Sequence, residues 1–113
     1  MIARVWAARL AKSNLNAYLQ HFSKNVLPEL KRCHGFAYVL VLRRDMDAET
    51  EVVVNTFWKD LASIEVFAGS DRDAAVVAPE AAALLNSYDK RVKHYVVDVF
   101  ERSPSVTLFD DRD

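Results

Sequence analysis

One stretch of the sequence, residues 52–69, predicts a strand that leads directly into a helix. Residues 52–58 are β-branched and aromatic, which favours a strand, and the apolar residues after position 60 follow helical spacing. Asp60 lies at the junction, where its carboxylate can accept hydrogen bonds from the first free N–H groups of the helix. Gly69 can end that helix in a left-handed conformation. Trp58 therefore lies at a corner between sheet and helix, a common place for a small-molecule pocket.

The remaining elements give the chain a β-α-β-β-α-β order. Strands are predicted for residues 2–8, 36–43, 50–58 and 91–101, and helices for residues 14–34, 61–68 and 79–88. Ser13 or Asn14 can cap the first helix, and Pro28 should kink or divide it near Asn25. This order is that of a ferredoxin-like α+β domain with a four-stranded antiparallel sheet. In that sheet the first strand lies between the third and the fourth, and the second strand lies at an edge.

Two of the predicted strands are apolar on both faces. Residues 36–42 do not alternate, and in the third strand Val53 and Phe57 lie opposite the face of Val54 and Trp58. An antiparallel sheet with one solvated face should alternate apolar and polar residues. Because a ferredoxin-like domain has helices on one face only, a second copy of the chain is the simplest cover for the other. We therefore predict a homodimer; the alternative is that strands are apolar in general.

Composition excludes several classes of partner. The chain has 113 residues, which predicts one domain, and its 15 lysines and arginines nearly balance its 16 aspartates and glutamates. No basic stripe is present, so neither nucleic acid nor a membrane surface is a predicted partner. The single cysteine, Cys33, excludes an intramolecular disulfide and fits a reducing compartment. Without a signal peptide or a long apolar run, the sequence predicts a cytoplasmic protein.

Two residues are candidates for catalysis. Trp58 can orient an aromatic substrate through stacking and its N–H, or it can be a core residue that fills the gap between sheet and helix. His94 is the histidine on a predicted strand, where it can act as a general base that takes a phenolic proton. The phenolate would then react with oxygen. The alternative is a structural histidine bonded to a backbone carbonyl, to Asp98 or to Tyr95.

Six further residues are candidates for binding a small hydrophobic or aromatic molecule: Arg4, Trp6, Tyr18, Phe22, Phe67 and Tyr88. Arg4 shares a predicted strand face with Trp6 and can hold a substrate anion, or it can pair with a carboxylate such as Asp98. The aromatic residues either line a pocket or form plain core. His21 is predicted on the helix surface. The histidines and carboxylates have no metal-ligand spacing, so no metal and no cofactor are predicted.

Four sets of residues form a characteristic combination along residues 1–100. They are residues 2–6, the run 55–71 with Trp58 and Phe67-Ala68-Gly69, the run 75–80 with Pro79-Glu80, and the run 92–97 with His94-Tyr95. This combination resembles the antibiotic biosynthesis monooxygenase superfamily, in particular its small members with the same motifs. The resemblance implies a dimeric α+β barrel, formed by a domain of residues 1–101 and followed by a polar tail of residues 102–113.

The resemblance also implies a type of function. Known members include cofactor-independent oxygenases that convert phenolic polyketides to quinones, and enzymes that bind and degrade haem. In both groups a tryptophan at the position of Trp58 lines the pocket, usually with an asparagine. Val54 and Trp6 occupy the two positions aligned with that asparagine, and residues 72–90 contain no histidine to ligate haem iron. The prediction is a cofactor-independent monooxygenase for a small aromatic or polycyclic substrate. The alternative is a homodimeric barrel that binds a small ligand, or has a stress role, without turnover.

Overall fold

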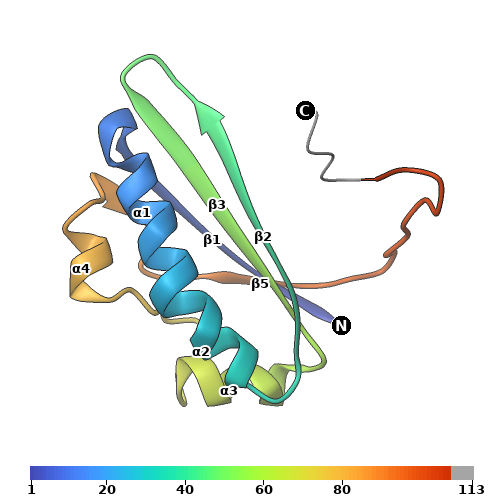
Figure 1. Ribbon diagram of the computed structural model, residues 1–113. Helices are drawn as coiled ribbons and strands as arrows, with labels where there is room; N and C mark the ends of the chain where they lie inside the picture. Colours follow the sequence, from blue (N-terminus) through green and yellow to red (C-terminus); the bar gives the residue numbers. More distant parts are fainter. Residues whose placement is uncertain (108–113) are drawn as a thin grey trace.

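The chain folds into one antiparallel sheet with helices on one of its faces (Figure 1). The computed structural model describes residues 1–107; residues 108–113, the end of the predicted tail, lie outside the described residues. The strands are β1 (Ile2–Ala11), β2 (Phe36–Asp45), β3 (Glu49–Trp58), β4 (Ser87–Tyr88) and β5 (Lys93–Val96). The helices are α1 (Leu15–His21), α2 (Leu27–Arg32), α3 (Leu61–Ala68) and α4 (Pro79–Ala82). Strands β2, β3 and β1 are adjacent in that order, and β4 and β5 both pair with the free edge of β1. The predicted α+β fold and strand order are confirmed.

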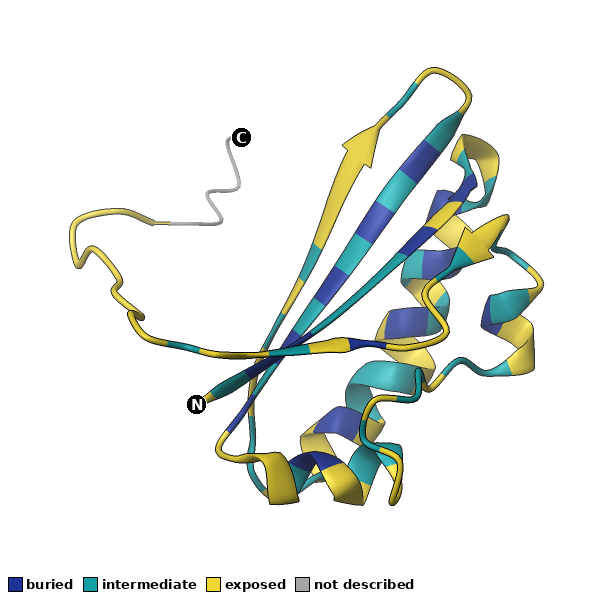
Figure 2. Cartoon of the chain, turned by 180° about the vertical axis from the view of Figure 1, so that it is seen from behind, coloured by how far each residue is buried: buried dark blue, intermediate teal, exposed yellow. Residues whose placement is uncertain are grey.

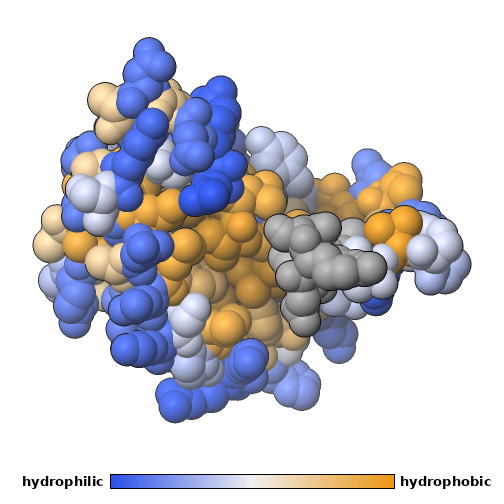
Figure 3. Space-filling view, turned by 45° about the horizontal axis from the view of Figure 1, so that its top comes forward, coloured by the Kyte–Doolittle hydropathy of each residue, from blue (hydrophilic) through white to orange (hydrophobic). Residues whose placement is uncertain are grey.

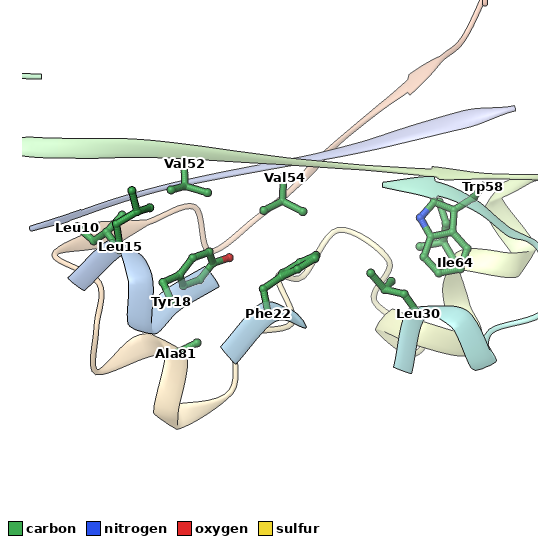
Figure 4. Close-up of a cluster of buried hydrophobic side chains, with 10 residues drawn as sticks. All are labelled: Leu10, Leu15, Tyr18, Phe22, Leu30, Val52, Val54, Trp58, Ile64 and Ala81. Atoms are coloured by element: carbon green, nitrogen blue, oxygen red, sulfur yellow. The ribbon is translucent and has the colours of Figure 1, made fainter. Parts of the chain in front are cut away.

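The core lies between the helices and one face of the sheet. Along β3 every second residue from Thr50 to Trp58 is buried, and the residues between them are half-buried (Figure 2). Helix α2 contributes Leu30 and helix α3 contributes Ile64, which are 1% and 0% exposed (Figure 4). The alternation follows from the two-residue period of a strand, which directs successive side chains to opposite faces.

The other sheet face, which we call the outer face, carries no helix. From their pairing, its residues include Val5 on β1, Tyr38, Leu40 and Leu42 on β2, Val53, Asn55 and Phe57 on β3, and Tyr95 on β5. Leu40 and Leu42 remain 45% and 47% exposed. In the space-filling view, apolar side chains gather into one broad area bounded by hydrophilic ones (Figure 3). This much exposed apolar surface is unusual for a monomer.

The first helical segment is divided as Pro28 predicts. Residues Phe22–Val26 form a π-helical turn between α1 and α2, and the N–H of Leu27 bonds to the carbonyl of Phe22. Pro28 then occupies the first turn of α2, where its missing N–H breaks no hydrogen bond. The predicted cap is wrong, because the Asn14 side chain instead donates to the carbonyl of Leu84, at 3.2 Å.

The junction between β3 and α3 forms as predicted from its local residues. Asp60 caps α3, accepting hydrogen bonds from the backbone N–H of Ser63 at 2.9 Å and from its hydroxyl at 2.6 Å. Gly69 ends the helix with a φ of 83° and a ψ of −169°, so its φ is positive but its ψ is not that of a left-handed helical residue. Gly35, with a φ of 94°, packs against the same junction.

Replacing Gly35 by alanine should lower the free energy of unfolding by about 2–4 kcal/mol. A Cβ atom there would lie 2.2 Å from the Ser63 hydroxyl oxygen, and the positive φ adds backbone strain. Gly69→Ala is the matched control, because it has a similar φ but no atom within 4 Å of the new Cβ. Urea unfolding of both variants should show the larger loss for Gly35→Ala; equal losses would exclude the contact with Ser63 as the cause.

The last third of the chain is less regular than predicted. The helix predicted for residues 79–88 ends at Ala82, and Tyr88 lies in β4 instead. The N–H of Asn86 bonds to the carbonyl of Arg9, which turns the chain back to the sheet. The strand predicted for residues 91–101 is limited to Lys93–Val96, because the N–H of Val97 bonds to the carbonyl of Met1 and β1 offers no further partner. Within residues 1–107, no helix is long and apolar enough to cross a membrane.

Candidate functional site

A cavity of about 70 Å³ lies between the sheet and the helices. Side chains from β1 and β3 form one side of it, and the helical segment of residues 15–32 and Phe67 of α3 contribute to the other. Residues 76–78, in the irregular connection between α3 and α4, complete the wall. The lining is largely apolar and includes the aromatic residues Trp6, Tyr18, Phe22 and Phe67. Such a cavity with a few polar groups is the usual form of a small-molecule site.

Arg4 supplies the one guanidinium group of this lining, and it is 4% exposed. The strand period places Arg4 and Trp6 on the helix-covered face, as predicted. Arg4 Nη1 donates to the carbonyl of Arg72 and to His94 Nε2 at 3.2 Å, and Nη2 donates to the carbonyl of Ala74 at 2.7 Å. The predicted pairing of Arg4 with Asp98 is therefore wrong. Burial lowers the pKa of Arg4 and nearby Asp73 opposes the shift, but an arginine stays charged at neutral pH.

His94 is positioned against Arg4, outside the cavity lining. Because a guanidinium can only donate, His94 Nε2 accepts, and Nδ1 carries the proton that is donated to Asp73 Oδ1 at 3.1 Å. Its partners are therefore Arg4 and Asp73, and not the backbone carbonyl, Asp98 or Tyr95 that the sequence predicted for a structural histidine. Burial and, next, the charge of Arg4 lower the pKa of His94. The free lone pair that a general base needs is thus directed at Arg4.

The lowered pKa of His94 predicts that the free energy of unfolding decreases as the pH falls. The pKa is lowered from a value near 6.5, so the unfolded chain binds a proton at a pH where the folded chain does not. Neutral His94 makes its full contribution to the free energy of unfolding above the unfolded pKa near 6.5. This contribution is lost as the pH falls towards the lower pKa that His94 has in the folded state. Unfolding free energies measured from about pH 7 to pH 5 should therefore decrease, and His94→Gln should flatten that slope. The exposed His34→Gln is the control and should retain it.

Trp58 is fully buried and does not line the cavity. Its indole N–H donates to the hydroxyl of Thr56 at 2.9 Å. Its ring packs against Phe36 and Phe67, with centroids 5.5 and 5.9 Å away. The structure thus shows the core alternative for Trp58: the residue fills the corner between sheet and helix, behind the lining residues Thr56 and Phe67.

The predicted aromatic residues divide into lining and supporting residues. Trp6, Tyr18, Phe22 and Phe67 line the cavity, whereas Tyr88 lies behind Trp6, with ring centroids 6.3 Å apart. The Trp6 N–H donates to the carbonyl of Asp89 at 2.9 Å. Burial raises the pKa of Tyr18 to about 12, so its hydroxyl is a neutral donor. Within residues 1–107 this hydroxyl has no hydrogen-bond partner, and it points along the gap towards Phe22 (Figure 4).

His21 is a cavity residue that the sequence did not identify. It is half-buried and lines the cavity, contrary to the prediction of a surface position. Its Nδ1 lies 3.0 Å from the side-chain amide nitrogen of Asn25, across the π-helical turn. The available signal was its spacing of three residues from Tyr18, which places both residues on the same side of α1. Among the described residues, no three His, Cys, Asp or Glu side chains are grouped as a metal site.

Fold and cavity together define a ferredoxin-like α+β domain with an internal, largely apolar cavity. Solved structures with this fold include a Bacillus cereus protein provisionally named an antibiotic biosynthesis monooxygenase: identity is 16%, 90% of this chain and 97% of that chain are covered, and the TM-score is 0.63. They also include the haem degrader MhuD from Mycobacterium tuberculosis, with two haems bound in its active site. Its identity to this chain is 14%, 90% of this chain and 100% of that chain are covered, and the TM-score is 0.62. A third is a provisionally named monooxygenase of the same kind from Deinococcus radiodurans. Its identity to this chain is 11%, 97% of this chain and 100% of that chain are covered, and the TM-score is 0.52.

The structural comparison confirms the fold that the sequence resemblance implies. The chain has the fold of antibiotic biosynthesis monooxygenase domain proteins, and the likeness extends over nearly the full length of each. No family model matches the sequence, and no curated protein matches it either.

Proposed function

We propose that this protein binds a small aromatic molecule in the cavity and oxidises it with molecular oxygen, without a metal or an organic cofactor. The observation that carries the proposal is the buried guanidinium of Arg4 in a cavity otherwise lined by aromatic and aliphatic side chains. A cation at that position stabilises a phenolate, the form of a phenol that donates an electron to oxygen. The fold shared with proteins named as monooxygenases supports the same reaction type.

Cavity size limits the ligand. Pockets for drug-sized ligands enclose about 300–1,000 Å³, far more than the 70 Å³ found here. A haem does not fit this cavity, so no haem chemistry is proposed for this chain. A single-ring compound matches the cavity better than the polycyclic substrate that the sequence also allowed.

A second candidate function is ligand binding without turnover. It is favoured by the position of His94, whose Nε2 faces Arg4 at 3.2 Å and so cannot accept a proton from a ligand in the cavity. Trp58 also lies behind the lining. The two functions differ in one measurable property, which is the consumption of oxygen.

The outer face supports a homodimer. Its apolar residues are exposed on β2, and its hairpin end carries charges of both signs in Arg9, Arg44 and Glu51, which suits a two-fold contact between identical faces. Asn55 lies at its centre, and within residues 1–107 its buried Oδ1 has no hydrogen-bond partner. A second copy would cover the apolar surface and supply donors to this region. We also propose that residues 1–101 form the domain and that the protein is cytoplasmic.

Oxygen uptake tests the catalytic function. Purified protein, treated with a chelator, should consume oxygen in the presence of hydroquinone and form the quinone and hydrogen peroxide faster than buffer does. Ala81→Leu is the control, since Ala81 lines the cavity and the three added carbons would fill it. We expect the variant to lose turnover while remaining folded. Binding of phenol without oxygen uptake would favour the binding function, and turnover that persists in Ala81→Leu would place the reaction outside the cavity.

A further inference from the structure

Arg4 has unused hydrogen-bond donors. A guanidinium has five N–H groups, and the three contacts of Arg4 occupy both on Nη1 and one on Nη2. The two that remain are on Nε and on Nη2. Unused guanidinium N–H groups form charge-assisted hydrogen bonds to the oxygens of a carboxylate.

The charge of Arg4 is not neutralised by an ion pair within residues 1–107. The acidic residue that acts on it most is Asp73, whose carboxylate bonds to His94 at 3.1 Å and lies 3.7 Å from Arg91. Asp71 binds Arg91 through both oxygens, at 2.8 and 3.1 Å. The partners of Arg4 are carbonyls and a neutral imidazole. A buried cation held only by neutral groups strongly favours the arrival of an anion.

The walls beside Arg4 suit an aromatic ring. The guanidinium carbon lies 6.0 Å from the centroid of the Phe67 ring, and Phe22 and Trp6 line the same cavity. The unpartnered hydroxyl of Tyr18 adds a neutral donor further along the gap. A ligand with a ring and an anionic group would therefore meet a complementary partner for each part.

The geometry points to an aromatic carboxylate as the class of ligand, with its carboxylate paired to the unused N–H groups of Arg4 and its ring between Phe67 and Phe22. This inference rests on the proposed function and names the ligand more closely. His94 and Asp73 are positioning residues, because His94 accepts from Arg4 Nη1 and donates in turn to Asp73. Entry of a ring requires movement of the wall at residues 76–78, since a cavity of about 150 Å³ is known to hold benzene.

Binding of two matched compounds tests the inference on the unaltered protein. Benzoate and benzamide have the same ring and nearly the same shape, and only benzoate is charged at neutral pH. Titration followed by tryptophan fluorescence, which Trp6 should report, should give a dissociation constant for benzoate about 10- to 100-fold lower than for benzamide. Equal dissociation constants would overturn the inference and leave the proposed function intact. Failure of both compounds to bind would overturn the proposed function with it.

Two variants locate the charge that is recognised. Arg4→Lys keeps a positive charge but lacks the planar edge, so the benzoate dissociation constant should rise about tenfold while that of benzamide changes little. Arg43→Lys, on an exposed position of β2, is the control and should bind both compounds as the unaltered protein does. Circular dichroism establishes that each variant is folded. A folded Arg4→Lys protein with unchanged benzoate affinity would exclude Arg4 as the anion site.

Discussion

Replacement of Trp58 by alanine is expected to lower the free energy of unfolding by about 3–5 kcal/mol. Trp58 is 0% exposed, and its removal would leave a large void between Phe36 and Phe67. Because whole domains are stable by only about 5–15 kcal/mol, this single change should remove a large fraction of the stability and lower the midpoint temperature of unfolding. Thermal unfolding followed by circular dichroism measures the effect.

Trp58→Phe separates the structural role of this residue from a catalytic one. The phenyl ring fills most of the space but cannot donate to Thr56, so we expect a smaller loss of about 1–3 kcal/mol. Ligand affinity should change less than twofold, because Trp58 does not line the cavity. If the folded Trp58→Phe variant instead lost turnover while binding its ligand normally, Trp58 would have the catalytic role that the sequence suggested.

Replacement of Leu40 by lysine is expected to convert the proposed dimer into a monomer. Leu40 lies at the centre of the outer face, opposite Asn55 on β3, and is 45% exposed in the isolated chain. A lysine there would bury its charge in the interface, and loss of at least about 2–3 kcal/mol raises the dimer dissociation constant about 30- to 140-fold. Sedimentation velocity over a range of protein concentrations measures the change.

Val66→Lys is the matched control for this experiment. Val66 is 69% exposed but lies on α3, on the opposite side of the sheet from the outer face. The variant should therefore sediment as the unaltered protein does. A monomeric unaltered protein, or equal effects of the two substitutions, would contradict the proposed interface.

The parts of the fold that the sequence predicted correctly are those specified by residues close together in the chain. The junction at Asp60 depends on Ser63, three residues away, and the division of the first helix depends on Pro28 and the turn before it. The order of the strands followed from the order of these local elements. The last third was predicted poorly because its structure depends on where β1 begins, which decides how far β5 can pair.

The site could be predicted only in part, for the same physical reason. Strand alternation placed Arg4 and Trp6 on one face, and helical spacing placed Tyr18 and Phe22 opposite them. The contacts that orient Arg4 come from Arg72 and Ala74, 68 and 70 residues further along the chain. Neither residue is part of a periodic pattern. Every residue has a backbone carbonyl, so the sequence does not indicate which carbonyls Arg4 contacts. Periodicity therefore predicted the cavity lining but not the state of its charged group.

The connection between Gly69 and Pro79 has a consequence for how ligand binding can be observed. It has no helix or regular strand, and its backbone is held mainly by the side chain of Arg4 and by short contacts near residues 90–92. Amide hydrogens in such a segment exchange with solvent through small local openings. A ligand that packs against residues 76–78 and Arg4 would oppose these openings. Deuterium uptake by this segment should therefore slow on ligand binding, while uptake in the centre of β3 stays the same.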